Sequence, residues 1–157
     1  MKKAIILFIS ITLFFSFISC GGGGIEGELK KIIGGGEGWN LEVFNNIKLN
    51  MSYDEVKALY PQLEDDRDYP WAYLEDHPVV DYYAFYFDEG KLVNVEVNLL
   101  ATLDIEEVRE ACLTLLKAKW GEPDETDEDY YYWYGEDYYM NMFYLFVDAW
   151  VIEVDLR

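Results

Sequence analysis

The chain has 157 residues, with 31 Asp and Glu against 12 Lys and Arg, and its formal net charge is −19. Because 52% of the residues are hydrophobic, this is not a disordered acidic tail, and its length suits one domain of ordinary size. A net charge this negative argues against direct binding to nucleic acid or to an anionic lipid surface, since both depend on clusters of Lys and Arg.

The first residues have the layout of an export signal. Two lysines precede an uncharged apolar stretch over 4–19, which is shorter than the roughly 20 residues that span a bilayer. The sequence therefore predicts a signal peptide over 1–19. Residues 17–20 resemble a bacterial lipobox, in which the thiol of Cys20 carries lipid and Cys20 becomes the first residue of the mature chain. Cleavage without lipid and an uncleaved N-terminal anchor are the alternatives, and each places the remaining chain outside the cytoplasm.

A glycine-rich segment follows Cys20. Glycines occupy 21–24 and most of 34–38, and the stretch between them is too short to be a stable helix alone. We expect residues 20–38 to act as a flexible tether between the lipid and the fold. The alternative is that Leu29, Ile32 and Ile33 dock on the domain.

Residues 39–157 are predicted to form a single α+β domain. Its first helix starts at Ser52, where the Ser52 hydroxyl and the Glu55 carboxylate can form a capping box and Met51 can pack on Val56. This helix is expected to stop before Pro61, because proline disfavours helical geometry in the preceding residue.

A second helix repeats this layout. Asp104 is its predicted cap, Glu107 is the partner of the cap, and Gly121 followed by Pro123 is a stop signal. Cys112 falls on the apolar stripe of this helix, so we expect it to be a core residue without a redox role. With Cys20 lipidated, no intramolecular disulfide is available.

Each helix is followed by strand patterns. The first set covers 82–87 and 92–99, joined by a turn with Gly90 in the left-handed position, and the second covers 130–134, 140–147 and 150–156. In 92–99 and in 150–156 apolar residues alternate with Asn, Asp and Glu, which is typical of antiparallel strands with one wet face. We predict two helix-plus-hairpin repeats, about 47–100 and 101–157, that share one antiparallel sheet with the helices on one face. Chance similarity between short amphipathic segments is the alternative.

The motif at 49–56 resembles the opening motif of small envelope lipoproteins of the SmpA/OmlA (BamE-like) type, and the twofold use of the unit resembles the β-lactamase inhibitory protein fold. This sequence has Asn50 where those families have glycine, and Tyr60 precedes Pro61 without the expected glycine. The resemblance covers roughly 47–156. It implies a non-enzymatic fold that presents a sheet surface to another protein.

Residues suited to catalysis or metal binding are few. His77 is the only histidine, so Ser-His, Cys-His and zinc sites are not expected. Acidic runs at 122–129 and 64–68 lack the spacing of an EF-hand, which favours solvated loops over a calcium site. A carboxylate pair that cuts glycosidic bonds is the least favoured possibility. We therefore predict no catalytic residue, no metal ligand and no cofactor.

The aromatic residues are the strongest functional signal. Alternation over 130–134 sends two rings to one face of the strand and three to the other. One face can belong to the core, and the other must be covered by another part of the chain, exposed to solvent or used to bind a partner. The candidate binding surface comprises Tyr130, Tyr131, Tyr132, Trp133, Tyr134, Tyr138 and Tyr139. A platform of such rings among acids suits a cationic protein segment, whereas stacking on a sugar and ordinary cross-strand pairing are the alternatives.

Together these patterns predict an exported, lipid-anchored lipoprotein of the cell envelope that faces the periplasm or the exterior. Its partners are expected to be the membrane, through the lipid, and a protein with a basic surface, with no nucleic acid. A glycan-binding module is the first alternative, and a carboxylate-dependent hydrolase is the second.

Overall fold

A computed structural model describes residues 24–34, 42–44, 46–64, 70–73, 77–145 and 149–157. The expected signal peptide over 1–19 and the lipidation site Cys20 lie outside these residues. The described elements are, in order, α1 (Ile25–Ile33), β1 (Glu42–Phe44), β2 (Ile47–Lys48), α2 (Tyr53–Leu59), β3 (Trp71–Tyr73), β4 (Val80–Asp88), β5 (Lys91–Leu99), α3 (Ile105–Trp120), β6 (Glu125–Thr126), β7 (Tyr130–Tyr134), β8 (Tyr138–Leu145) and β9 (Ala149–Leu156). The predicted α+β class is confirmed.

Seven of the strands form one sheet. Its order is β3-β4-β5-β9-β8-β7-β6, and every neighbouring pair is antiparallel. The strands β1 and β2 pair separately. The continuous antiparallel sheet is therefore as predicted, and its centre is the pairing of β5 with β9, which joins the earlier strands of the chain to the later ones.

Helix α2 begins at the predicted capping box. The Ser52 hydroxyl accepts from the Glu55 N–H at 3.3 Å, and the Glu55 carboxylate accepts from the Ser52 N–H at 2.7 Å. The helix ends at Leu59, and the ring of Tyr60 packs against Tyr83 and Phe85 of the sheet, with centroids 5.2 and 5.5 Å apart. These ring contacts place α2 on the apolar face of the sheet.

Helix α3 also has the predicted ends. The Asp104 carboxylate accepts from the Glu107 N–H at 2.9 Å, and Gly121 terminates the helix with φ of 87°, a left-handed value that glycine adopts without strain. The buried side chains of Val108, Cys112 and Leu116 join the same core as the sheet, as the apolar stripe predicted.

The hairpin of β4 and β5 shows the alternation read from the sequence. Val95 and Val97 are buried in the core, and the turn has Glu89 and Gly90 at φ of 47° and 75°. Val93 departs from the pattern, since the register with β4 shifts there and its side chain is only half-buried. A bulge of this kind turns one residue out of the strict period of two.

The expected tether over 20–38 is wrong for 25–33. These residues form α1, which packs on α3 and buries Leu29, Ile32 and Ile33, so the docking alternative is correct. The ammonium of Lys119 in α3 donates to the carbonyls of Ile33 at 2.6 Å and of Val43 at 2.9 Å, and burial lowers its pKa to about 8. Residues 25–33 therefore belong to the fold, which was expected to begin at residue 39, because burial stabilises a helix that is too short to persist alone.

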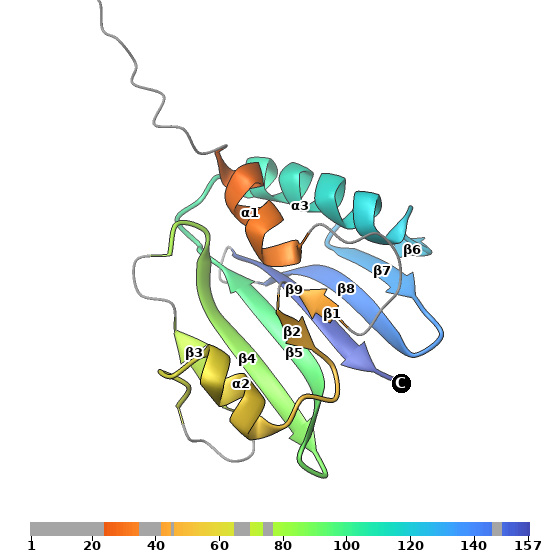
Figure 1. Cartoon of the computed structure of the whole chain (residues 1–157). Coiled ribbons are helices and arrows are strands. Elements are labelled where there is room, and N and C mark those ends of the chain that lie inside the picture. The colour runs from red at the N-terminus through yellow and green to blue at the C-terminus, as the bar shows by residue number, and fades with distance from the viewer. Residues whose placement is uncertain (1–23, 35–41, 45, 65–69, 74–76, 146–148) are drawn as a thin grey trace, which may run out of the picture.

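All three helices lie on one side of the seven-stranded sheet (Figure 1). On this side the Trp150 indole of β9 donates to the Ile105 carbonyl at the start of α3 at 3.2 Å. No described helix covers the opposite side. Among the described helices, none has the length and apolar character needed to cross a membrane.

Candidate functional site: the open face of the sheet

Three rows of side chains cross the uncovered side of the sheet, which we call the open face. The strand registers define each row, because directly opposed residues on neighbouring strands point to the same side. The first row contains Tyr73, Tyr82, Asn98, Val151, Phe143 and Tyr130. The middle row contains Trp71, Ala84, Glu96, Glu153, Asn141, Tyr132 and Glu125. The third row contains Tyr86, Asn94, Asp155, Tyr139 and Tyr134.

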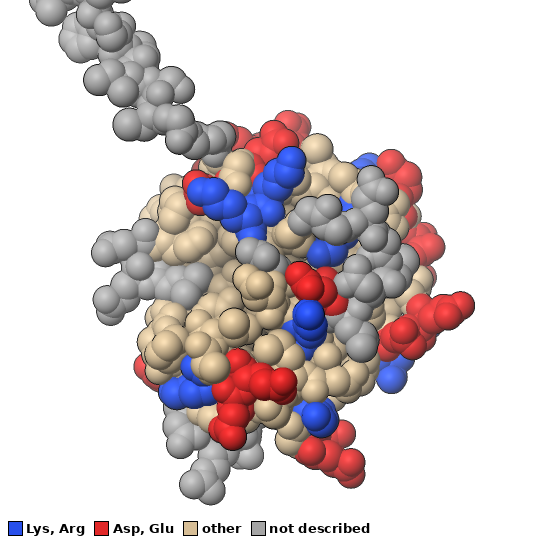
Figure 2. Space-filling model, in the orientation of Figure 1, with Lys and Arg blue, Asp and Glu red and all other residues tan. Residues whose placement is uncertain are grey.

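The rows give the open face a polar centre between two aromatic flanks. Rings from β3 and β4 lie on one side, and rings from β7 and β8 lie on the other. Carboxylates and amides occupy the central strands β5 and β9. None of the three rows contains Lys or Arg, whereas the helix side of the molecule carries lysines and arginines among its acids (Figure 2). The open face is therefore acidic at its centre.

Glu153 is held at the middle of the open face by two amides. Asn94 in β5 donates to Glu153 Oε1 at 2.7 Å, and Asn141 in β8 donates to Glu153 Oε2 at 2.8 Å. Glu96 is directly opposite Glu153 in the register of β5 and β9. Like charges in directly opposed positions of antiparallel strands destabilise the pair, so this centre favours the approach of a cation.

Tyr139 and Asp155 form a second polar contact on this face. The Tyr139 hydroxyl donates to Asp155 Oδ2 at 2.8 Å. Burial raises the pKa of Tyr139 to about 12, with further contributions from the hydrogen bond and from the negative charge of Asp155. The phenol therefore stays protonated and remains a donor at neutral pH.

The tyrosines of β7 stack on one another. The rings of Tyr130 and Tyr132 have centroids 6.2 Å apart with 6° between their planes, and Tyr132 and Tyr134 have the same separation with 12°. Phe143 stacks on Tyr130 at 6.0 Å, and the Arg157 guanidinium lies over the Tyr134 ring at 5.4 Å. Because the ring faces contact their neighbours, a partner approaching this flank meets ring edges and hydroxyls.

Two members of the predicted binding surface are buried instead of exposed. Trp133 is 0% exposed and its indole donates to the Gly121 carbonyl at 2.8 Å, while Tyr138 is 1% exposed and its hydroxyl accepts from Trp120 at 3.2 Å. Both belong to the core. Tyr131 also faces the core side, where it packs against Trp150 and is half-buried.

Four of the predicted residues do share the open face. Tyr130, Tyr132, Tyr134 and Tyr139 occupy neighbouring positions there, and Tyr130 and Tyr134 are each 41% exposed. The alternation separated the two faces of β7 but did not show which of them faces the core, so the predicted surface included residues from both.

Trp71 and Tyr73 on β3 were not predicted as part of a site. They come from a strand of three residues, which is too short for a periodic signal. The central amides also went unassigned, although the alternation of Asn94, Glu96 and Asn98 already placed them on a wet face.

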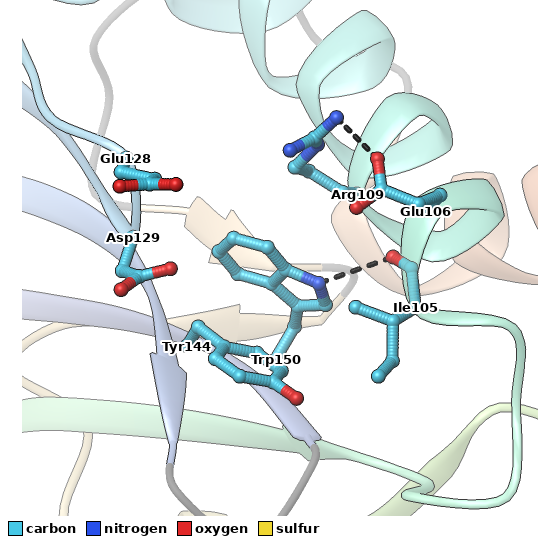
Figure 3. A pocket seen from close by; sticks show the side chains of 7 residues that line it. All are labelled: Ile105, Glu106, Arg109, Glu128, Asp129, Tyr144 and Trp150. Atoms are coloured by element: carbon cyan, nitrogen blue, oxygen red, sulfur yellow. Dashed lines mark hydrogen bonds and ion pairs between the residues drawn. The ribbon is translucent and has the colours of Figure 1, made fainter.

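A hollow of about 380 Å³ lies on the helix side, near the start of α3 (Figure 3). Its lining residues are Ile105, Glu106, Arg109, Glu128, Asp129, Tyr144 and Trp150. Arg109 is paired with Glu106, and the Trp150 indole is engaged by the Ile105 carbonyl. The three carboxylates that line the hollow are exposed.

The remaining reactive groups have structural roles. His77 Nδ1 accepts from the N–H groups of Val79 and Val80 at 3.3 and 3.0 Å, and burial lowers the pKa of His77. Burial raises the pKa of the Cys112 thiol. Over the described residues, no three His, Cys, Asp or Glu side chains converge as metal ligands. Of the acidic runs, 125–126 form β6, and 65–68 lie outside the described residues.

No protein-family model, curated protein or solved structure matches this chain.

Proposed function

We propose that the protein is an exported, lipid-anchored lipoprotein of the cell envelope whose open sheet face binds a basic segment of another protein without catalysis. The observation that carries this proposal is the acidic centre of the open face, flanked by tyrosines and free of Lys and Arg in all three rows. Tyrosine and tryptophan are enriched in protein-binding surfaces, and a negative centre is electrostatically complementary to a basic partner.

Glycan binding is the second candidate, because aromatic side chains beside amides and carboxylates are also the composition of sugar sites. The stacked geometry of β7 disfavours it. Sugar rings pack on the faces of aromatic rings, and the faces of Tyr132 are turned toward Tyr130 and Tyr134.

We also propose that the chain consists of two related units. Helix α2 precedes the hairpin of β4 and β5, and helix α3 precedes the strands β7, β8 and β9. The order β3-β4-β5 runs inward to the centre of the sheet, and β9-β8-β7 runs outward from it. This order supports the two-repeat arrangement that the resemblance to SmpA/OmlA-type lipoproteins and to the β-lactamase inhibitory protein implies.

The proposed anchor is a lipidated Cys20. Helix α1 begins at Ile25, so five residue steps separate a lipidated Cys20 from the docked helix, a span of at most ~18 Å. Cys20→Ala tests the anchor in cell fractionation and in mobility on a gel. Unchanged membrane association together with unchanged mobility would show that Cys20 carries no lipid.

The binding proposal is tested by capture from an envelope extract at low and at physiological salt. Tyr86→Ala and Tyr130→Ala remove rings that are 47% and 41% exposed on opposite flanks of the open face. Leu59→Ala is the matched control, because Leu59 is 41% exposed but belongs to α2 on the helix side.

A basic partner should be captured at low salt, lost largely at physiological salt, lost with both tyrosine variants and kept with Leu59→Ala. Capture that survives physiological salt and is competed by soluble glycan would favour the glycan alternative. If the tyrosine variants capture the same partner as the wild type, the open face is not the binding surface.

A further inference from the structure

The polar centre of the open face contains buried groups that the fold leaves unsatisfied. Among the described side chains, three buried polar atoms lack a hydrogen-bond partner: Trp71 Nε1, Asn98 Nδ2 and Asn141 Oδ1. All three belong to rows of the open face. Asn98 and Asn141 are only 4% and 6% exposed. Folded proteins pair nearly all such groups, so an unpaired buried amide calls for a functional explanation.

One of the two amides has an unpaired acceptor and the other has an unpaired donor. Asn141 already donates its Nδ2 to Glu153, and its Oδ1 remains an unused acceptor beside that carboxylate. Asn98, on the neighbouring row, has an unused donor. A ligand that satisfies the unpaired atoms of both amides must therefore place an N–H donor at the middle row and an acceptor at the first row.

The middle row also defines the charge of the ligand. Glu153 has each carboxylate oxygen bound by one amide, so its orientation is set while lone pairs remain for a further donor. Glu96 is opposed to it on β5, and Asn141 is opposed to it on β8. Three oxygen-bearing side chains on three adjacent strands thus lie in line, about 5 Å apart from strand to strand.

We propose that this centre binds the guanidinium group of an arginine in an extended segment of the partner protein, and that Asn98 binds a main-chain carbonyl of the same segment. The inference rests on the proposed function and names the chemical group that the open face recognises. A guanidinium is planar and carries five N–H donors in a fixed fork, which matches a carboxylate and an adjacent carbonyl oxygen in one row. An ammonium has three donors around one point and matches this row less well.

The flanking side chains fit the same ligand. Tyr132 lies beside Asn141 on the middle row. Its ring faces are turned toward Tyr130 and Tyr134, so the phenol oxygen, rather than the ring face, is its acceptor for a guanidinium N–H. The unpaired amide atoms are shielded from solvent by their neighbours. Contact with the ligand therefore requires a local movement of the open face, with no change in the helices.

The proposal is tested on the full-length protein in a mild detergent, with N-acetyl-arginine amide as the probe. Each such molecule carries one guanidinium and two amide carbonyls. N-acetyl-lysine amide and N-acetyl-citrulline amide are the matched probes, since the first keeps the charge and the second keeps the planar shape. Binding is followed by NMR, through the side-chain NH₂ resonances of Asn94, Asn98 and Asn141.

We expect saturable shifts of these resonances with the arginine probe, several-fold weaker binding of the lysine probe and no shift with the citrulline probe. Glu153→Gln should lower the affinity for the arginine probe at least about tenfold, because it removes a charge-assisted contact. Glu110→Gln is the control on the exposed side of α3 and should leave binding unchanged. Equal binding of the lysine and arginine probes, or shifts that persist in Glu153→Gln, would overturn the proposal.

Asn98→Leu separates a binding role from a structural one. If Asn98 serves only the fold, the variant should lower the unfolding midpoint and leave the probe affinity unchanged. If Asn98 binds a ligand, removing its unpaired donor should keep or raise the unfolding midpoint and lower the affinity for the probe. If the arginine probe does not bind but capture of the partner still requires Tyr86 and Tyr130, only the guanidinium site is overturned. If capture does not require these tyrosines, the proposed function itself is overturned.

Discussion

Replacement of Trp133 distinguishes the core side of β7 from its open face most directly. Trp133 is fully buried, whereas the next residue, Tyr134, is 41% exposed. Truncating a buried tryptophan to alanine costs about 3–5 kcal/mol, because apolar contacts are lost and a cavity remains. Tyr134→Ala removes one stacked neighbour on the surface and should cost less than about 1 kcal/mol. The expected difference between the two variants is therefore at least about 2 kcal/mol.

The assay is urea unfolding of the full-length protein, followed by circular dichroism. With the denaturant slope unchanged, the loss of stability is read from the shift of the midpoint. If Trp133→Ala fails to fold, Trp133→Phe keeps a ring but removes the donor to Gly121, and we expect a loss of about 1–2 kcal/mol. Tyr134→Phe is its control. A Trp133→Phe variant that is no less stable than Tyr134→Phe would refute the placement of Trp133 in the core.

Three further outcomes are expected. Asp104→Ala should lower the free energy of unfolding by about 1 kcal/mol, since it removes the cap of α3, and equal urea midpoints for variant and wild type would contradict this. Lys119→Met should speed amide hydrogen exchange in α1 far more than Lys117→Met does, because only Lys119 donates to the Ile33 carbonyl, and equal exchange would show that this contact does not hold α1. The third concerns His77, whose pKa is below its ordinary value of 6.5, so that the unfolded chain binds a proton before the folded protein does. The contribution of His77 to the free energy of unfolding is then fully present above pH about 6.5 and is lost as the pH drops through the lowered pKa. His77→Asn keeps an acceptor without titrating and should flatten this dependence, and an unchanged slope would contradict the role of His77.

The helix ends were predictable because their signals are local. Ser52 with Glu55, and Asp104 with Glu107, lie within four residues of each other, so both capping pairs can be recognised without knowing the rest of the fold. The stop at Gly121 is local in the same way, since the positive φ is a property of that residue.

Helix α1 was misjudged because its stability is not local. Its nine residues are too few for an isolated helix in water. It persists because Leu29 and Ile33 are buried against α3, and because Lys119, far away in the sequence, donates to its last carbonyl. No pattern within 25–33 reveals that contact.

By itself the sequence determined the acidic character, the α+β class, the two helices with their ends and the alternation of the long strands. These follow from composition and from interactions within one turn or one strand. Only the tertiary structure decided that Trp133 belongs to the core and Tyr132 to the surface, and that Glu153 lies between Asn94 and Asn141.

The physical reason is that a strand's own period defines two faces without saying which one is covered. The order of strands and the side on which the helices pack make that choice, and both depend on residues that are distant along the chain. The three rows of the open face exist only once β5, β9, β8 and β7 lie side by side in register.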